Sequence, residues 1–193
     1  MTFRLGLTGS IGMGKSTTAE FFREVGVPVW DADAAVHRLY ASGGAGTKAI
    51  AALCPEAVGP NGVDRAALKT WLAREPGRLV QLESVIHPLV AADRERFIAE
   101  TEASLVVLDI PLLFETGADV DAVLVVTAPE EVQRARVLAR PGMDRAHLEQ
   151  ILDRQMPDAE KRARADFIIE TLNMDTTRHA VQDLVTKLES DNA

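Results

Sequence analysis

Short runs of consecutive apolar residues alternate along the chain with longer segments in which apolar residues recur every three or four positions. The short runs are typical of strands in a parallel sheet that is covered on both faces, and the longer pattern predicts amphipathic helices. The predicted strands are Phe3–Thr8, Val27–Trp30, Leu105–Leu108, Ala122–Thr127 and Asp166–Ile169. Strands that alternate with helices in this way predict an α/β fold built on a doubly wound, five-stranded parallel sheet.

Helical patterns fill the segments between these strands, and the middle of the chain is mostly helical. The predicted helices are Lys15–Val25, Asp33–Ala41, Thr47–Leu53, Asp64–Arg74, Arg78–Glu102, Glu130–Ala139, Ala146–Met156 and Thr176–Leu188. We expect Arg78–Glu102 to be interrupted at His87-Pro88, because proline disfavours helical backbone at the residue before it.

Composition narrows the class of protein. The 193 residues fit one domain of ordinary size, and 47% apolar with 26% charged residues is typical of a soluble globular chain. A net charge of −8 disfavours general binding to nucleic acid or to an anionic membrane, so any phosphate site must be local. The single cysteine, Cys54, excludes an internal disulfide. Neither a signal peptide nor a membrane span is expected, which predicts a cytoplasmic protein.

Polar residues follow the ends of several predicted strands. They are Gly9–Ser16, Asp31, Asp33, Asp109 and Thr127. Ligands of open parallel sheets bind beyond the carboxyl ends of the strands. We therefore expect these residues to converge on one crevice.

The first of these segments matches the P-loop pattern, Gly9-x4-Gly14-Lys15-Ser16, between an apolar strand and a helix. Glycines let the backbone turn tightly and aim its N–H groups at one anion, and the helix N-terminus adds partial positive charge. A chance glycine-rich turn is the alternative. The residues predicted to bind ATP are Gly9, Ile11, Gly12, Met13, Gly14, Lys15, Ser16 and Thr17.

Acidic residues follow two other strands. Asp109 ends an apolar run, as in a Walker B strand, and can hold Mg²⁺ through water, orient an acceptor or cap the next turn. Of Asp31 and Asp33, one is expected to cap the following helix, and the other to accept a proton from an acceptor hydroxyl or to hold the metal shell. Asp33 is the predicted base.

Arginines are dense between Arg134 and Arg164. They form either a solvated helix pair with surface ion pairs or a lid that brings one or two arginines to the transferring phosphate. Arg140 stands out, because Pro141 follows it and places it at a bend. The four histidines show no metal-binding spacing, and His87, which precedes Pro88, is expected to be structural.

Taken in order, these motifs resemble the dephospho-coenzyme A kinase family over nearly the whole chain. The resemblance rests on Leu7–Thr17, Asp31-Ala32-Asp33, Gly62–Arg65 with Leu68, Leu82-Glu83, His87-Pro88, Asp109-Ile110-Pro111-Leu112-Leu113-Phe114-Glu115, Arg134, Arg140, Gln155 and Ala165-Asp166. The chain departs from the family pattern at Ser10, Pro141, Thr171 and Asn173.

The resemblance implies a single adenylate-kinase-like domain over residues 1–193, with a core, a helical substrate subdomain at about 34–102 and a lid at about 134–164. It implies transfer of the γ-phosphate of ATP to the ribose 3′-hydroxyl of dephospho-CoA with Mg²⁺, which is the last step of coenzyme A synthesis. The alternatives are another P-loop kinase, acting on a nucleoside monophosphate or a sugar, and a nucleotide-binding module without catalysis. The oligomeric state stays open.

Roles for individual residues follow from the same resemblance. Asp33 takes the place of the base, and Lys15 and Arg140 stabilise the transferring phosphate. Ser16 and Asp109 are the predicted Mg²⁺ ligands, Asp109 through water. The predicted acceptor-binding residues are Asp31, Asp33, Arg65, His87, Asp109 and Leu113.

Overall fold

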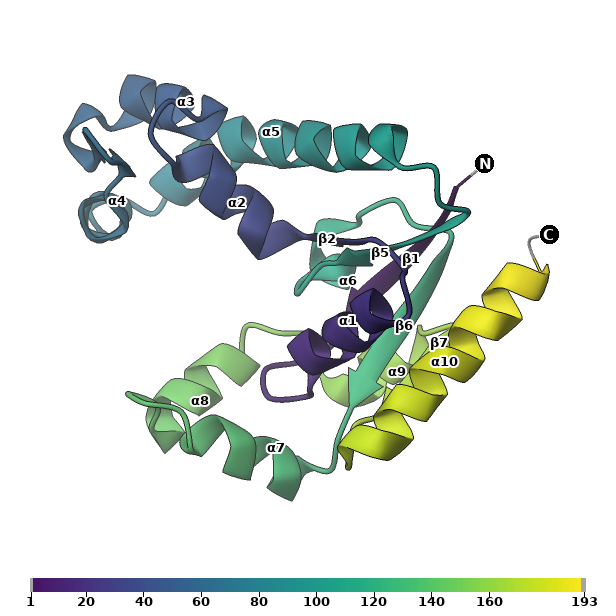
Figure 1. Ribbon diagram of the computed structural model, residues 1–193. Helices are drawn as coiled ribbons and strands as arrows, with labels where there is room; N and C mark the ends of the chain where they lie inside the picture. The colour runs from purple at the N-terminus through teal and green to yellow at the C-terminus, as the bar shows by residue number, and fades with distance from the viewer. Residues whose placement is uncertain (1, 192–193) are drawn as a thin grey trace. The chain divides into compact units, whose positions relative to one another are not determined.

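A computed structural model describes residues 2–191 and contains, within that range, a five-stranded sheet in the order β2-β5-β1-β6-β7 (Figure 1). The strands are β1 (Phe3–Thr8), β2 (Val29–Asp31), β5 (Leu105–Asp109), β6 (Ala122–Thr127) and β7 (Phe167–Glu170). β1 pairs in parallel with β5 and β6, and β6 pairs in parallel with β7. The predicted α/β fold is confirmed.

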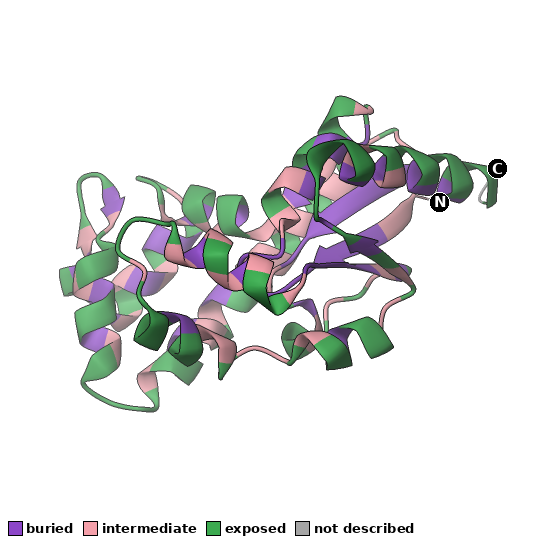
Figure 2. Ribbon diagram, turned by 90° about the horizontal axis from the view of Figure 1, so that it is seen from below, coloured by how far each residue is buried: buried purple, intermediate pink, exposed green. Residues whose placement is uncertain are grey.

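Helices cover both faces of the sheet, which is why its strands are apolar without interruption. Leu5 and Leu7 of β1 point into a core shared with α1 (Lys15–Glu24) and α10 (Met174–Asp191). Gly6 faces the other way, because a Cβ there would lie 2.9 Å from Leu113 of α6 (Leu113–Thr116). β1, β5 and β6 are accordingly buried over most of their length (Figure 2).

Three shorter helices follow β6 in the chain. They are α7 (Glu130–Leu138), α8 (Arg145–Leu152) and α9 (Asp158–Ala163). The pattern predicts the first two of these but neither α9 nor α6. Helices of four or six residues show too little periodicity to be recognised.

The chain divides into two compact units, a sheet unit of Met1–Trp30 with Thr101–Ala193 and a helical unit of Asp31–Glu100. The helical unit has a core of its own. Its elements are α2 (Ala32–Tyr40), α3 (Ala45–Leu53), the 3₁₀ turn η1 (Pro55–Ala57), the hairpin of β3 (Val58–Gly59) and β4 (Gly62–Val63), α4 (Arg65–Ala73) and α5 (Arg78–Glu100). Cys54 is buried in this core.

The expected interruption at His87-Pro88 is wrong, because α5 continues through Pro88. Proline inside a helix removes one N–H donor and crowds the preceding turn. Leu82 and Ile86, one turn apart, are buried in the core of the helical unit. Leu89 and Val90, after the proline, pack against the same core. The helix is therefore supported on both sides of Pro88, because helices in proteins are held mainly by their buried face.

Candidate phosphate-binding site

The loop between β1 and α1 has the conformation that its glycines predict. Gly12 and Gly14 have φ values of +79° and +87°, in the left-handed region that favours glycine. A Cβ on Gly14 would also lie 2.7 Å from Oγ1 of Thr171, and one on Gly9 would lie 2.8 Å from the carbonyl oxygen of Val126. Side chains at these positions would push the loop away from the strands that support it.

The N-terminus of α1 is left open to an anion. Its N-cap residue is Gly14, and among the described residues no side chain caps it and no acidic residue lies in the first turn. The first N–H groups of a helix have no partner inside the helix, so those of Lys15, Ser16 and Thr17 remain available. They carry the positive end of the helix dipole and suit a phosphate group.

The opposite side of the loop is tied to distant parts of the sheet unit. The N–H of Ile11 donates to Oε1 of Gln155 over 3.1 Å, and Nε2 of Gln133 donates to the carbonyl of Ile11 over 2.7 Å. The hydroxyl of Thr171 donates to the carbonyl of Met13 over 2.8 Å. These bonds hold the loop from outside and leave the amides of its inner side for a ligand.

Lys15 and Asp109 meet at the carboxyl ends of β1 and β5. Their Nζ and Oδ1 atoms lie 2.5 Å apart, and the Asp109 side chain is only 3% exposed. Parallel pairing sets Leu7 beside Asp109, which brings the end of β5 next to the phosphate loop. The hydroxyl of Thr8 also donates to the carbonyl of Pro111, so β1 is tied to the segment that follows Asp109.

A cavity of about 340 Å³ opens beside the loop. Its lining includes Arg136 of α7, Arg140 just after that helix, and Thr171 after β7. Arg136 donates to the hydroxyl of Thr171 over 3.0 Å and to its carbonyl. The other lining residues are Gly12, Gly14, Thr17, Leu172, Asn173, Met174 and Thr177. The predicted phosphate-stabilising residue Arg140 therefore lies in the same cavity as part of the phosphate loop.

The sequence prediction does not include Gln133 and Arg136 among the site residues. Gln133 is 5% exposed and lies one turn before the buried Val137. A polar residue on the apolar face of a predicted helix was the available signal. Arg136 had no distinguishing signal among the many arginines of this segment.

Other arginines of the segment form the surface ion pairs that the sequence left open as an alternative. Arg134 pairs with acidic residues of α7 and α8, and Arg162 and Arg164 pair with acidic residues of α9. In the pairs of Arg134 with Glu130 and of Arg164 with Glu160, both side chains are partly exposed. Ion pairs at such positions contribute little to stability.

The acidic pair Asp31 and Asp33, at the end of β2 and the start of α2, belongs to the helical unit. Oδ1 of Asp31 accepts from the N–H of Ala34 over 2.9 Å, so Asp31 caps α2. Asp33 lies exposed in the first turn of that helix. One of the two carboxylates therefore caps the helix, as expected, and the predicted roles of both toward an acceptor stay predictions.

The remaining predicted residues have diverse surroundings. The Arg65 guanidinium lies 5.7 Å from the centre of the Tyr40 ring, and His87 is exposed on α5. Leu113 is 3% exposed and packs toward Gly6, while Ser16 is exposed in the first turn of α1. Acceptor binding by Arg65, His87 and Leu113 stays a prediction.

The sheet order and the open phosphate loop after the first strand define the class of the protein as the P-loop phosphotransferases. A family model described as dephospho-CoA kinase matches residues 3–176. The chain belongs to the dephospho-CoA kinase family, as its motifs predicted.

Relatives extend this match to nearly the whole chain. A dephospho-CoA kinase of Cereibacter sphaeroides is 60% identical and aligns over 96% of this chain and 95% of its own length. One of Jannaschia sp. is 57% identical, with 97% and 98% covered. A Thermus thermophilus crystal structure matches with a TM-score of 0.85 and 37% identity, covering 97% of this chain and 98% of that one.

Two further solved structures show the same fold at lower identity. A dephospho-CoA kinase of Campylobacter jejuni has a TM-score of 0.73 at 24% identity, and both chains are covered completely. A shikimate kinase of Acinetobacter baumannii has a TM-score of 0.52 at 17% identity, with 99% and 95% covered. Within residues 2–191, no helix has the length and apolar character needed to cross a membrane.

Proposed function

We propose that this chain transfers the γ-phosphate of ATP to the ribose 3′-hydroxyl of dephospho-CoA, giving coenzyme A and ADP. The observation that carries the proposal is the uncapped N-terminus of α1, with Lys15 in its first turn and the loop held from outside. Phosphoryl transfer depends mainly on positioning and on stabilising charge, and this arrangement supplies both. Family membership supports dephospho-CoA as the acceptor.

The nucleotide is proposed to lie along the loop, with its β- and γ-phosphates on the first-turn amides and Lys15. Arg140 and Arg136 line the neighbouring cavity and can face the adenosine or the phosphate chain. The exposed hydroxyl of Ser16 and the carboxylate of Asp109 are oxygen donors of the kind that Mg²⁺ takes together with phosphate oxygens. Bound there, Mg²⁺ would neutralise charge on the β- and γ-phosphates.

The acceptor is proposed to be held by the helical unit, Asp31–Glu100, which overlaps the range of about 34–102 expected for a substrate subdomain. Asp33 orients the 3′-hydroxyl and takes its proton, and the segment around Arg140 acts as the lid. Asp33 suits this role because it is exposed, while Asp31 is engaged in capping. The net charge of −8 supports small-molecule partners rather than nucleic acid. A cytoplasmic location is part of the same proposal and rests on membership of this metabolic family.

The acceptor assay tests the reaction. Purified protein, ATP, Mg²⁺ and dephospho-CoA should yield coenzyme A and ADP in equal amounts. Turnover of nucleoside monophosphates or sugars without turnover of dephospho-CoA would reject the acceptor. Binding of ATP without phosphorylation of any acceptor would favour a nucleotide-binding module.

Asp33→Asn tests the base. We expect kcat to fall about 100-fold or more, because general base catalysis contributes about 10²–10⁴-fold. The Kd for ATP should stay nearly unchanged, since the variant keeps the loop and Lys15. A variant with normal kcat would remove Asp33 from this role.

A further inference from the structure

Helix α9 carries a buried cation that the proposed reaction does not use. Lys161 is 0% exposed, and no hydrogen-bond acceptor reaches its Nζ atom in the part of the chain that the structure describes. Its nearest acidic partner is Oε1 of Glu115, 3.8 Å away. Burial lowers the pKa of Lys161, and the charges of Glu115 and Asp158 oppose that shift. A lysine in this position is costly to bury.

Glu115 connects this lysine to the backbone before α9. It lies in α6, at the end of the Asp109–Glu115 segment. The same Oε1 atom that faces Lys161 accepts the N–H of Met156 over 2.9 Å. Oε1 of Glu115 therefore faces the positive charge of Lys161 in α9. It also accepts a hydrogen bond from Met156, which lies just before that helix.

Gln155, the residue before Met156, contacts the phosphate loop. Its Oε1 atom accepts the N–H of Ile11 over 3.1 Å. Because neighbouring residues share a rigid peptide plane, fixing the N–H of Met156 restricts where Gln155 can place its side chain. A continuous set of contacts thus runs from Lys161 through Glu115 and Met156 to Gln155 and Ile11.

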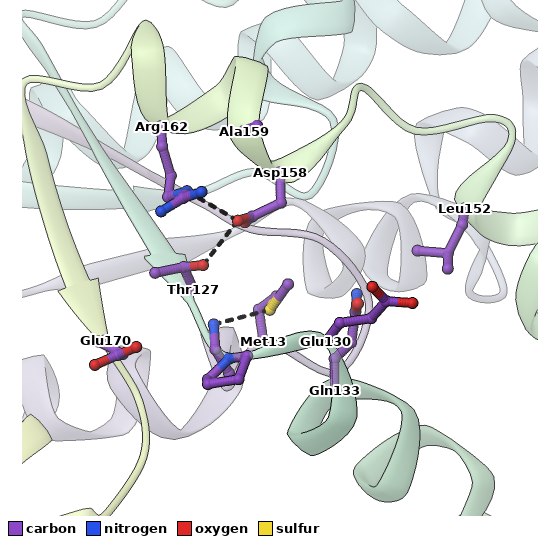
Figure 3. A pocket seen from close by; sticks show the side chains of 11 residues that line it. Met13, Thr127, Glu130, Gln133, Leu152, Asp158, Ala159, Arg162 and Glu170 are labelled. Atoms are coloured by element: carbon purple, nitrogen blue, oxygen red, sulfur yellow. Dashed lines mark hydrogen bonds and ion pairs between the residues drawn. The ribbon is translucent and has the colours of Figure 1, made fainter.

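A second contact anchors the start of α9 (Figure 3). The hydroxyl of Thr127, at the end of β6, donates to Oδ2 of Asp158 over 2.9 Å. Arg162 reaches the same oxygen over 3.1 Å. With this end of the helix held to the sheet, Lys161 is directed inward and acts mainly on Glu115.

From these contacts we propose that Lys161 is a positioning residue for phosphoryl transfer. Its charge holds the Glu115 carboxylate, and through Met156 and Gln155 it holds the phosphate loop at Ile11. The same carboxylate ends the segment that begins with Asp109, the partner of Lys15. Lys161 thereby sets the loop and the Asp109–Glu115 segment in one arrangement. A methionine would fill the space at lower cost, so packing alone does not call for a charge here.

The test compares Lys161→Met with Glu115→Gln and with the control Arg164→Met. Glu115→Gln keeps an oxygen for the N–H of Met156 and removes the charge. Arg164 lies just after α9 and is exposed, and it pairs with Glu160 of that helix. Arg164→Met therefore removes an exposed cation close to Lys161 in sequence. Each variant is assayed for kcat, for KM of ATP and dephospho-CoA, and for the thermal unfolding midpoint. The inference rests on the proposed function, so the parent protein is assayed first. An inactive parent would reject that function, whereas an active parent lets the variants decide.

We expect Lys161→Met to lower kcat about 10-fold or more, because small misplacements of reacting groups are costly. Its KM for ATP should change less than about threefold, and its unfolding midpoint should equal or exceed that of the parent. Glu115→Gln should show the same loss of kcat, and the double variant should lose no more than either single one, because both act through one contact. Arg164→Met should match the parent.

Three results would overturn the proposal. One is an unchanged kcat in Lys161→Met. Another is a loss of kcat that only follows a loss of folded protein, which would make the lysine merely structural. The third is additive losses in the double variant. Should Lys161→Met fail to fold, Glu115→Gln decides alone, because a normal kcat in that variant contradicts the role.

Discussion

Two lysine–carboxylate pairs in the sheet unit stand in contrast. At the phosphate loop, Nζ of Lys15 lies 2.5 Å from Oδ1 of Asp109, and the lysine side chain is 18% exposed. At α9, Nζ of Lys161 lies 3.8 Å from Oε1 of Glu115, and the lysine side chain is 0% exposed. The first lysine is well paired and reachable, and the second is poorly paired and enclosed.

Burial and pairing of a charge therefore serve different ends in these two pairs. Lys15 can exchange Asp109 for a phosphate, since both lie at strand ends where ligands bind. Lys161 can reach no ligand from its enclosed position, so it acts only on its neighbours. A charge that touches the reaction and a charge that arranges the site therefore respond differently to removal.

Replacing Lys15 should have the largest effect of these changes, and that effect is on catalysis. Lys15→Met should lower kcat/KM on the order of 10³-fold, because a preorganised cation at developing charge is among the strongest catalytic contributions. In the same assay of ADP formation, kcat/KM should fall far less in Lys161→Met than in Lys15→Met. More than a tenth of parental activity in Lys15→Met would contradict a direct role on the phosphates.

The next effect is on stability at the phosphate loop. Lys15→Met should lower the free energy of unfolding by about 3 kcal/mol, because the buried Asp109 loses its lysine partner. Lys15→Met with Asp109→Asn should recover most of that loss and remain inactive. Urea unfolding at pH 7 measures both. A double variant as unstable as the single one would show that the buried charge is not the cause.

At α9 we expect the free energy of unfolding to change in the opposite direction. Lys161→Met should keep the parental free energy of unfolding or raise it by about 1 kcal/mol, because replacing a buried charge by an apolar side chain is often neutral or stabilising. The same urea titration measures it, with Arg164→Met as the matched control. A loss of more than about 1 kcal/mol would mean that Lys161 stabilises the fold.

The smallest expected effect is on the pH dependence of the difference in unfolding free energy between Lys161→Met and the parent protein. Burial lowers the pKa of Lys161 in the folded chain below its ordinary value of 10.5, although Glu115 and Asp158 face it. Between the two pKa values the unfolded chain binds more protons than the folded one, so parental stability rises with pH. The advantage of Lys161→Met should therefore shrink as the pH approaches 10.5. A constant difference across that range would contradict burial as its cause.

Much of the fold was predictable because its signals are local. The strands follow from continuous apolar runs, and the prediction places β1 and β6 at their observed bounds and β2 within two residues. The predicted interruption at Pro88 was wrong, because the buried face of α5 outweighs the local preference of proline against helix. The hairpin Val58–Val63 was missed, because two-residue strands leave no pattern.

The phosphate loop, the class of fold and the family could be read from the chain alone, because each strand pattern and each motif consists of residues that are close in sequence. Only the tertiary structure decided how the loop is held and which charges meet. Ile11 bonds to Gln133 and Gln155, and Lys161 faces Glu115, across separations that no spacing rule connects. The physical reason is that a short motif specifies its own backbone, whereas the partners of a buried charge are chosen by the packing of the whole unit.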